Sequence, residues 1–468
     1  MGEAFLDYKK GAGLKLNDII EEFKYVYKGQ NIKAGDFVNF INGVAGQTTE
    51  TSVDTVIDNV NTYAGYKISA VVLNSNKIFV SHSYGSNYYL YGVVLTINGA
   101  TITLGSDTQL SSTAYSGNAM ETIVLDENRV FIARRNGSSS GGSLYGMICT
   151  INGTTITVNT DTAINSSNYT GTTISAVALD KSRIFIAHRY NSSNALYGIV
   201  CTINGTTISK GSETSISTAT YASDTISAAL LNDGKVFIAH NYGANYYLYG
   251  IVCSISGTTI TKGTATSLNN STEHAGASIS TRVLPNGNVL IAHTYTSSYY
   301  LYGLVCSVSG TTITKGTDTQ LSSESYTGIE ARMVVLNDND VLIAHTYTSS
   351  YYLYGIVCSI SGTTITKGTD TQLNSTTHTG FSISALPLGE SIIIIHSHTT
   401  SKYYLYAQMW GINGKTPTNK VTTTQYEQQV ATALEAPFDG VALTNGTGGT
   451  ATAHKEQIKI AVPDVEVI

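Results

Sequence analysis

Histidine recurs at one position of a repeated sequence motif, and imidazole is the side chain best suited to bind a metal or transfer a proton near neutral pH. The histidines at this position are His82, His188, His240, His293, His345 and His396. The second copy of the motif has Arg134 there instead, and arginine does not serve as a metal ligand. We therefore expect each histidine to make a structural hydrogen bond within its own repeat unit, and we expect no metal and no cofactor.

The cysteines also share one position of the repeat, but their setting does not indicate a redox or metal site. They are Cys149, Cys201, Cys253, Cys306 and Cys358, while Leu95 and Trp410 stand at this position in the first and last copies. A slot that accepts leucine or tryptophan is apolar and buried. Equivalent positions of neighbouring units do not meet the short separation that a disulfide demands, and no Cys-x-x-Cys pair marks a zinc site. We expect free, buried thiols.

Tyrosine supplies the strongest candidate for a binding site. A Tyr-Tyr-Leu-Tyr segment recurs, and its first tyrosine is Tyr88, Tyr246, Tyr299, Tyr351 or Tyr403, with Asn87 and Asn245 preceding two of them. Strand alternation places Tyr89 and Tyr91 on one face and Tyr88 on the other. The first tyrosine can therefore pack between neighbouring units or stand at a rim, where a rigid ring flanked by amides and hydroxyls binds a sugar. We take these tyrosines and asparagines as candidate glycan-binding residues.

Acidic residues do not form the singular pair that glycoside hydrolysis needs. Asp107, Asp318 and Asp370 occupy equivalent turns of different copies, so each belongs to the repeat. The repeat length varies only between 52 and 54 residues at the last tyrosine of the motif, which leaves no room for a long catalytic loop. We therefore expect that the protein is not an enzyme and has no catalytic residues, and a polysaccharide-degrading tail enzyme is the third functional alternative.

These positions must be held by β-sheets, because each repeat of about 52 residues contains four strand-length segments bounded by turns. In the fourth copy the segments are 226–231, 235–242, 246–255 and 258–262. An Asn-Gly or Ser-Gly pair separates the third and fourth segments in every copy, and such pairs favour two-residue hairpins. Seven copies fill residues 46–414, which predicts an all-β fold with a seven-bladed β-propeller of four antiparallel strands per blade. A β-solenoid is the alternative, but its coils are shorter than this unit.

The two ends of the repeat region predict how the ring closes. The seventh copy lacks the segment GTTITKGT after Gly414, whereas residues 51–60 precede the first copy without a partner. A propeller closes its ring when one blade takes strands from both chain ends. We therefore expect residues 51–60 to supply the outer strand of the seventh blade.

Composition and charge exclude several classes of protein. The 468-residue chain has a formal net charge of −6 and only 12% charged residues, so it lacks a basic surface suited to nucleic acid or anionic lipid. No segment is apolar for the roughly 18 residues that a membrane span requires, and the N-terminus lacks the pattern of a signal peptide. We expect no nucleic-acid or membrane partner, and release by lysis if the protein acts outside a cell.

Residues 1–45 and 415–468 carry a higher density of charge than the repeats and together have the size of a small domain. The first contains NIKAGDFVNFI at 31–41, and the second contains FDGVALTNGTGG at 438–449 followed by QIKIAVP at 457–463. These segments resemble the small β-barrel of phage capsid-decoration proteins, in which both belong to one barrel. The resemblance implies a discontinuous β-barrel-like domain that anchors the chain to a virion through Ile32, Gly35, Phe37, Val38, Gly440 and Val441.

Residues 14–27 are expected to form a short amphipathic helix. Asn17 would cap this helix, and Ile19, Ile20, Phe23 and Val26 would lie along one face. The helix would pack on the barrel or dock on a neighbouring virion subunit.

Together these features indicate a non-enzymatic bacteriophage structural protein of the capsid or tail, assembled in the host cytoplasm and resident in the virion. Its expected partners are other virion proteins and a host-surface glycan bound by the propeller as an adhesin. A homo-oligomer is compatible with the sequence. A purely structural capsid-decoration protein without a ligand is the closest alternative.

Overall fold

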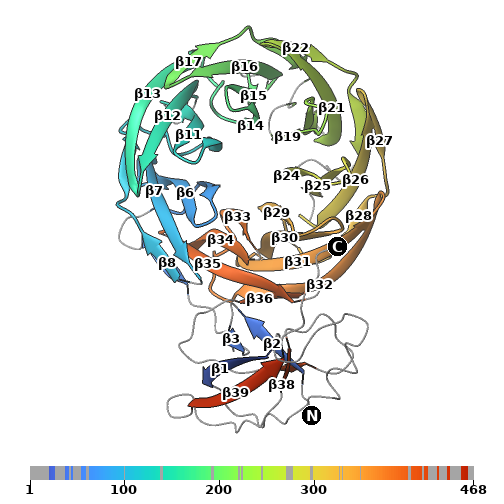
Figure 1. The fold of residues 1–468 in the computed structure, drawn as a ribbon. Coiled ribbons are helices and arrows are strands. Elements are labelled where there is room, and N and C mark those ends of the chain that lie inside the picture. Colours follow the sequence, from blue (N-terminus) through green and yellow to red (C-terminus); the bar gives the residue numbers. More distant parts are fainter. Residues whose placement is uncertain are drawn as a thin grey trace. The chain divides into compact units, whose positions relative to one another are not determined.

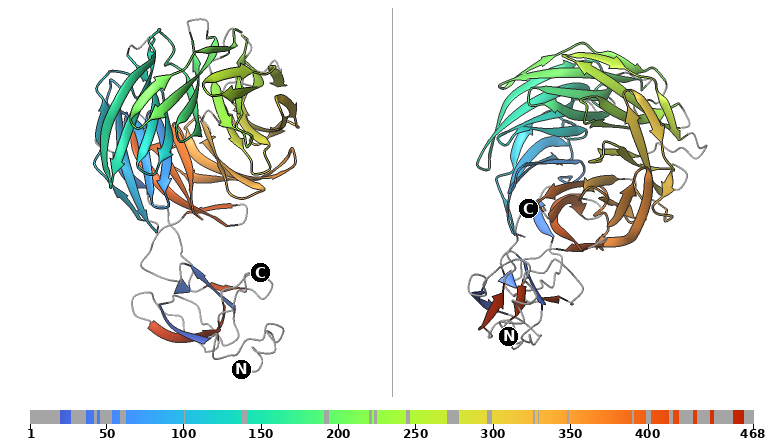
Figure 2. Two further views of the ribbon diagram at one scale, coloured as in Figure 1. Left: turned by 45° about the horizontal axis from the view of Figure 1, so that its top comes forward. Right: turned by 45° about the vertical axis from the view of Figure 1, so that its right-hand side comes forward.

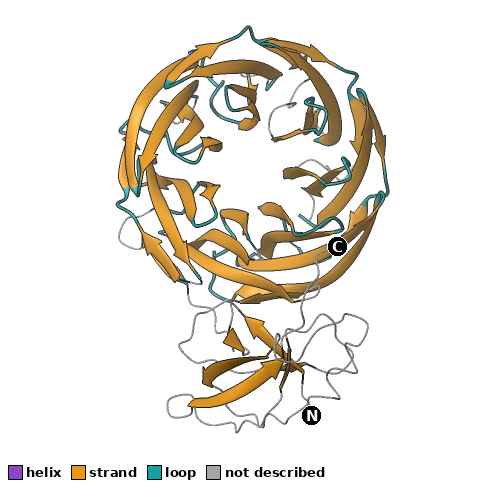
Figure 3. Cartoon of the chain, in the orientation of Figure 1, coloured by secondary structure: helices purple, strands orange, loops and turns teal. Residues whose placement is uncertain are grey.

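The computed structural model describes most of the repeat region and short stretches of both chain ends. Before residue 54 and after residue 411 it describes the backbone alone. Among the described residues every regular element is a β-strand (Figure 3), and no helix able to cross a membrane occurs there. The described residues are 20–26, 37–41, 44–45, 54–58, 63–99, 101–137, 141–190, 194–219, 222, 225–243, 246–269, 278–295, 299–325, 327–328, 330–347, 349–389, 391–398, 402–413, 416–419, 429–431, 440–442 and 455–461.

The chain divides into two compact units. One contains Met1–Ser52 and Lys420–Ile468, and the other contains Val53–Asn419. The second unit is a β-propeller whose seven antiparallel sheets are arranged in a ring (Figures 1 and 2). In each blade the first strand lies nearest the centre and the last strand lies at the outside (Figure 1). The predicted fold class is confirmed.

Three strands of every blade follow the predicted segments. The first strands are β5 (Ile68–Asn74), β10 (Met120–Asp126), β14 (Ile174–Asp180), β19 (Ile226–Leu230), β24 (Ile279–Val283), β29 (Ala331–Val335) and β33 (Ile383–Leu388). The second strands are β6 (Lys77–Tyr84), β11 (Arg129–Asn136), β15 (Arg183–Arg189), β20 (Val236–Tyr242), β25 (Val289–Thr294), β30 (Asp340–Tyr347) and β34 (Ser391–His398). The third strands are β7 (Tyr89–Asn98), β12 (Ser143–Asn152), β16 (Leu196–Asn204), β21 (Tyr247–Ser256), β26 (Leu301–Ser309), β31 (Tyr352–Ser361) and β35 (Tyr404–Asn413).

The outer strand is continuous in two blades, as β13 (Thr155–Asn165) and β32 (Thr364–Asn374). In the other blades two short strands pair in turn with the third strand. These pairs are β8 (Thr101–Leu104) with β9 (Thr108–Ser111), β17 (Thr207–Lys210) with β18 (Thr214–Ser217), β22 (Thr259–Lys262) with β23 (Thr266–Asn269), β27 (Thr312–Lys315) with β28 (Thr319–Gln320), and β36 (Thr416–Asn419) with β4 (Thr55–Asp58).

The last of these pairs closes the ring. Strand β4, from the N-terminal side, pairs with β35 so that Asp58 lies opposite Leu405, which confirms the predicted closure. A further strand that the sequence did not predict, β36, follows Gly414 and pairs with the other half of β35. Its sequence lacks the repeat pattern and contains Pro417, but an outer edge strand tolerates a proline.

Apolar side chains are packed between neighbouring blades and not at one centre. At the interface of blades 1 and 2, for example, Phe79 and Leu90 share a buried cluster with Ile132 and Cys149. All the cysteines are buried free thiols, as predicted. Burial raises the pKa of each thiol to about 12, so none of them has thiolate character near neutral pH.

The strands of the first unit form one antiparallel sheet that joins both chain ends. Strand β1 (Ile20–Val26) pairs with β39 (Lys455–Ala461), which pairs with β38 (Gly440–Ala442). Strand β38 pairs in turn with β2 (Phe37–Ile41), which also pairs with β3 (Val44–Ala45) and β37 (Gln429–Ala431). Of the anchoring residues expected from the resemblance, Phe37 lies opposite Val441 and Val38 opposite Gly440, while Ile32 and Gly35 lie outside the described residues.

The helix expected over residues 14–27 is wrong over residues 20–26, where the chain forms β1, and residue 27 lies outside the described residues. Pairing with β39 supplies hydrogen-bond partners that a local helical pattern does not anticipate, and tertiary context overrides helix propensity. The aromatic and β-branched residues of β1 also suit a strand. Residues 14–19 lie outside the described residues.

Candidate functional site at the channel mouth

The repeated histidines hold outer strands to their blades. In blade 1, the Nε2 atom of buried His82 lies 3.0 Å from Asp107 Oδ1, and its Nδ1 atom lies 2.8 Å from the Ser83 carbonyl oxygen. Burial lowers the pKa of His82, but the Asp107 carboxylate more than offsets this and the net shift is upward. Equivalent pairs are His188 with Glu213, His293 with Asp318, His345 with Asp370, and His396 with Asp54. The predicted structural role is confirmed for these histidines.

Blade 4 lacks this acid because Ala265 stands at its position. Burial lowers the pKa of His240 to about 4, and its Nε2 atom has no hydrogen-bond partner among the described residues. Within the same residues, no group of three or more His, Cys, Asp and Glu side chains is arranged to hold a metal ion. The histidines are therefore structural positions and not the candidate site.

The first tyrosines of the repeated segment do not belong to strands. Each has a positive φ, between 47° at Tyr403 and 54° at Tyr351, and precedes the third strand of its blade. The alternation argument for Tyr88 is therefore wrong. Hydrogen bonds fix this backbone: the Tyr88 amide donates to the Gly85 carbonyl over 3.0 Å, and the Gly117 amide donates to the Tyr88 carbonyl over 2.8 Å. All these rings are half-buried.

Three of the candidate tyrosines gather in one aromatic cluster across blades 6, 7 and 1. The ring centroids of Tyr66 and Tyr88 are 4.7 Å apart, and those of Phe381 and Tyr403 are 4.5 Å apart. We call this group the mouth cluster, and its members are Tyr63, Tyr66, Tyr88, Tyr351, Phe381 and Tyr403. Its rings support one another, so their orientation is set before any ligand binds.

Sequence reasoning missed Tyr63, Tyr66 and Phe381, which lie in the segments that cross from one blade to the next. The sequence held a signal for Tyr63, because several of these crossings have an aromatic residue or histidine two residues before a glycine. In the structure these aromatic residues and the histidine have a positive φ. The other candidate tyrosines, Tyr246 and Tyr299, belong to blades 4 and 5. Asn87 is exposed and donates to the Tyr89 hydroxyl over 3.1 Å, and Asn245 lies outside the described residues.

The channel is a cavity of about 940 Å³ lined by the first strands of all seven blades. Most of its lining consists of serine, threonine and aliphatic residues. Several serines link adjacent first strands: Ser69 Oγ accepts from the Thr122 amide over 2.9 Å, and Ser175 Oγ accepts from the Ala228 amide over 3.0 Å. These serines hold the blades together around the channel.

Charged side chains interrupt this regular lining. We call them the channel set, and its members are Lys67, Glu121, Arg282, Glu330 and Arg332. Glu121 and Arg332 occupy the position at which other copies have the linking serine. Sequence reasoning missed the channel set because it considered the residues that the copies share. The residues of the channel set each depart from the residue found at the same position in other copies.

The channel set combines carboxylates and cations in an enclosed space. Glu330 lies 3.5 Å from Lys67 Nζ and 3.2 Å from an Arg332 guanidinium nitrogen. Burial raises the pKa of Glu121 although Arg332 and Arg282 act to lower it. The Arg282 side chain is accessible from the channel, but the surrounding first strands keep it away from bulk water and lower its pKa, although Glu121 acts to raise it. Because Lys67 directly follows Tyr66, the channel set adjoins the mouth cluster.

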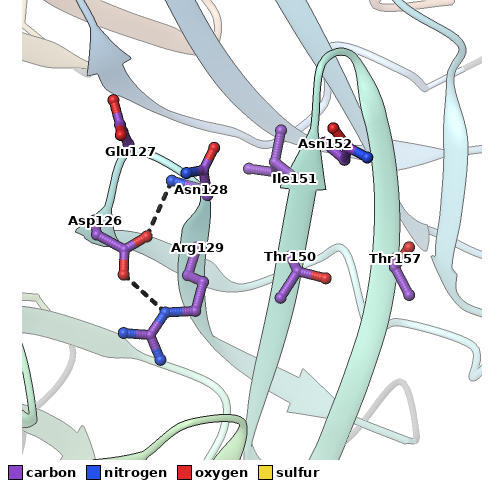
Figure 4. A pocket seen from close by; sticks show the side chains of 8 residues that line it. All are labelled: Asp126, Glu127, Asn128, Arg129, Thr150, Ile151, Asn152 and Thr157. Carbon is purple, nitrogen blue, oxygen red and sulfur yellow. Dashed lines mark hydrogen bonds and ion pairs between the residues drawn. The ribbon is translucent and has the colours of Figure 1, made fainter.

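A second cavity, of about 450 Å³, lies at the turn between β10 and β11 and is not a candidate site (Figure 4). Arg129 donates from Nε to Asp126 over 2.8 Å and from its guanidinium to the Gly205 carbonyl of the next blade over 2.5 Å. Arg183 makes the equivalent contact with the Gly257 carbonyl over 3.1 Å. The repetition shows that this arginine links neighbouring blades.

Comparison with known proteins identifies the fold but no family. No protein-family model matches the chain, and no curated protein matches it. A protein of known structure from Lactobacillus plantarum is similar over 76% of this chain and 98% of its own, with a TM-score of 0.52 and 9% identity. A putative 6-phosphogluconolactonase from Bacteroides fragilis is similar over 77% of this chain and 98% of its own, with a TM-score of 0.50 and 10% identity. The structure of an ulvan lyase, a polysaccharide lyase, is similar over 78% of this chain and 96% of its own chain, with a TM-score of 0.46 and 10% identity.

These comparisons correct one expectation. We expected that the protein is not an enzyme because its blades are regular in length, yet a structure of this fold is described as a putative 6-phosphogluconolactonase. Regular blades therefore do not exclude catalysis. The likeness concerns the fold and names no reaction for this chain.

Proposed function

We propose that the propeller binds a carbohydrate at the mouth of its channel. The observation that carries this proposal is the mouth cluster, a group of half-buried aromatic rings of which Tyr66 and Phe381 directly precede residues that line the channel, Lys67 and Ser382. Sugar rings present C–H faces that stack on aromatic rings, while their hydroxyls need polar partners close by. The mouth cluster and the hydroxyl-lined channel supply both.

The backbone of the tyrosines supports a role beyond packing. Tyr88, Tyr351 and Tyr403 have left-handed backbone conformations, which cost about 1 kcal/mol or more for a residue other than glycine. Blade 3 shows that Asn194, which suits this conformation better, is accepted at the same position with a φ of 61°, whereas Gly142 in blade 2 has a different φ of 146°. Tyrosine in the other blades therefore contributes something that the turn itself does not require.

The test replaces mouth tyrosines with the residue that blade 3 already carries there. We expect Tyr88→Asn and Tyr403→Asn each to weaken carbohydrate binding about fivefold, since one stacking contact is worth roughly 1 kcal/mol. Tyr242→Asn is the matched control, because Tyr242 is 37% exposed and belongs to blade 4. Affinity is measured by calorimetry on a ligand first identified on a glycan array. Equal affinities for all three variants would contradict the proposal.

A second candidate is an enzyme that acts on the bound carbohydrate. It is favoured by Glu121 and Glu330, two carboxyls that line the channel and do not recur in the other copies. Burial raises the pKa of Glu121, which is a property of catalytic acids. Incubation with the array-identified oligosaccharide, followed by mass spectrometry, tests this candidate. Products that form with the natural protein and not with Glu121→Gln would establish it.

For the setting of this binding we propose display on a phage particle, where the unit built from both chain ends attaches the propeller to virion proteins. The support is the resemblance of residues 31–41 and 438–449 to capsid-decoration proteins, together with the pairing of β2 with β38. Under this proposal the propeller is an adhesin for a host-surface glycan. Fractionating phage particles and probing them with an antibody against the propeller tests it.

A further inference from the structure

We propose that the carbohydrate is acidic and that Arg282 and Arg332 bind its carboxylate or sulfate group within the channel. This inference rests on the proposed carbohydrate binding and adds the charge of the ligand. It follows from three features of the described residues: the balance of charge in the channel, the state of Arg282, and the arginines on the same rim as the mouth cluster.

The channel set has more cations than carboxylates. Lys67, Arg282 and Arg332 face Glu121 and Glu330 in one cavity. The local excess of positive charge opposes the formal net charge of −6 of the whole chain. The cavity volume of about 940 Å³ is within the usual range of small-ligand sites, about 300–1,000 Å³. The cavity is therefore suited by both size and charge to an anionic group.

Arg282 is the cation best placed to receive that group. Its side chain is exposed to the channel, and its Nε atom donates to the Met333 carbonyl over 3.1 Å. It makes no ion pair with any described residue, whereas Arg332 is paired with Glu330 over 3.2 Å. A guanidinium that keeps unpaired N–H groups in an enclosed space binds carboxylate or sulfate in a two-point geometry. Arg332 lies on the adjacent blade and can share the anion.

The rim carries further cations where it lacks the first tyrosine. Blades 2 and 3 have Gly142 and Asn194 at that position. In these blades Arg135 lies over the Tyr115 ring at 5.6 Å, and Arg189 lies over the Tyr169 ring at 5.0 Å. A Cβ atom on Gly142 would lie only 2.6 Å from Arg135 Nε, so the arginine occupies the space of the missing side chain.

The rim therefore has aromatic rings on blades 6, 7 and 1, a half-buried Arg189 on blade 3, and on blade 2 a buried Arg135 that donates to the Gly141 carbonyl. A saccharide that stacks on the mouth cluster and reaches into the channel meets the Arg282 and Arg332 side chains that line it. A neutral saccharide would leave the Arg282 guanidinium without an anionic partner among the described residues. The arrangement thus favours a chain in which sugar rings and negative charges alternate.

The experiment uses the full chain and a glycan array that carries acidic oligosaccharides and their neutral counterparts. One series pairs uronate oligomers with their carboxyl-reduced forms. The other series pairs sulfated oligomers with their desulfated forms. We expect binding to the acidic members of one or both series, and the series that binds distinguishes carboxylate from sulfate. The affinity of the best ligand is then compared by calorimetry between the natural protein and three variants.

The variants are expected to change affinity in opposite directions. Arg282→Gln should weaken binding of the acidic ligand at least about tenfold, because a hydrogen bond to a charged partner is lost. Glu121→Gln should strengthen it, because a carboxylate that repels the ligand is removed. Arg183→Gln is the matched control: it makes the same chemical change at the β14–β15 turn, outside the channel, and should leave the affinity unchanged.

The outcomes separate this inference from the proposed function. Binding that is equal for acidic and neutral counterparts, or that Arg282→Gln does not weaken while it stays folded by circular dichroism, overturns the acidic ligand but keeps carbohydrate binding. If Arg282→Gln unfolds, Glu121→Gln decides: unchanged or weaker binding overturns the inference. Absence of binding to every saccharide overturns the proposed function and the inference with it.

Discussion

Asp54 is predicted to keep the propeller ring closed. This residue directly precedes β4, the strand that the N-terminal side contributes to blade 7. Its carboxylate lies 3.0 Å from His396 Nε2 and 3.6 Å from His398 Nε2, both in blade 7, and it accepts from Asn374 Nδ2 of blade 6 over 2.8 Å. The Asp54 carboxylate thus joins the start of β4 to blades 6 and 7.

The magnitude follows from these contacts. The Asp54 side chain is only 16% exposed, so solvent replaces little of what a substitution removes. A hydrogen bond to a charged group contributes about 1.5–3 kcal/mol, and we expect Asp54→Asn to lower the free energy of unfolding by about 2 kcal/mol. Asp107→Asn is the matched control, because it alters the same contact with a histidine, His82, in a blade whose strands are continuous in sequence.

The dependence on pH provides a second test of the same contact. Burial raises the pKa of Asp54, but the hydrogen bond and charge of His396 more than offset this, and the net shift is downward from 3.8. The contribution of Asp54 to stability is therefore fully present above pH 3.8 and is lost as the pH falls through the lower folded value. Asp54→Asn should remove this acid dependence.

The assays are urea unfolding and hydrogen exchange of the amides of Thr55–Asp58. We expect Asp54→Asn to speed this exchange, because β4 can leave β35 more easily, and Asp107→Asn to leave it unchanged. If Asp54→Asn had the stability and β4 exchange rate of the natural protein, the reasoning about ring closure would be refuted.

Four further predictions concern other parts of the chain. Ala265→Asp should supply the missing acid in blade 4, raise the pKa of His240 from about 4, and stabilise the protein by roughly 1 kcal/mol; an unchanged imidazole titration by NMR would contradict it. The cysteine thiols should not react with Ellman's reagent until the protein unfolds, because burial raises their pKa to about 12. Reaction in the folded state would show that the thiols are accessible to solvent. Deleting residues 51–60 should remove β4, expose the edge of β35 and cause aggregation, which light scattering would detect. A protein truncated to residues 46–419 should keep glycan binding but fail to join phage particles, whereas normal incorporation would show that the propeller itself docks.

The sequence predicts the propeller because its signals are repeated. The strand segments and the glycine turns recur in every copy, and each repetition reinforces the same period. The buried role of Cys149 could be predicted in the same way, since Leu95 and Trp410 stand at the equivalent position. Ring closure through β4 was predictable from a segment without a partner, but β36 was not, because it departs from the repeat.

The candidate site could be predicted only in part, for the same physical reason. Tyr88 and Tyr403 recur and were identified, but their backbone conformation depends on hydrogen bonds to a crossing segment of the neighbouring blade. The channel set was missed because Glu121 and Arg282 are single departures from a repeated pattern. Their meaning appears only when the ring brings the first strands of distant blades around one cavity.

The most direct test of the central claim is a structure of the protein bound to the oligosaccharide that the array identifies. The account predicts a ligand at the channel mouth, with sugar rings on Tyr66, Tyr88 or Tyr403 and an acidic group beside Arg282. A ligand bound at the outer edge of the blades or on the unit formed by the chain ends, with the mouth cluster empty, would contradict it.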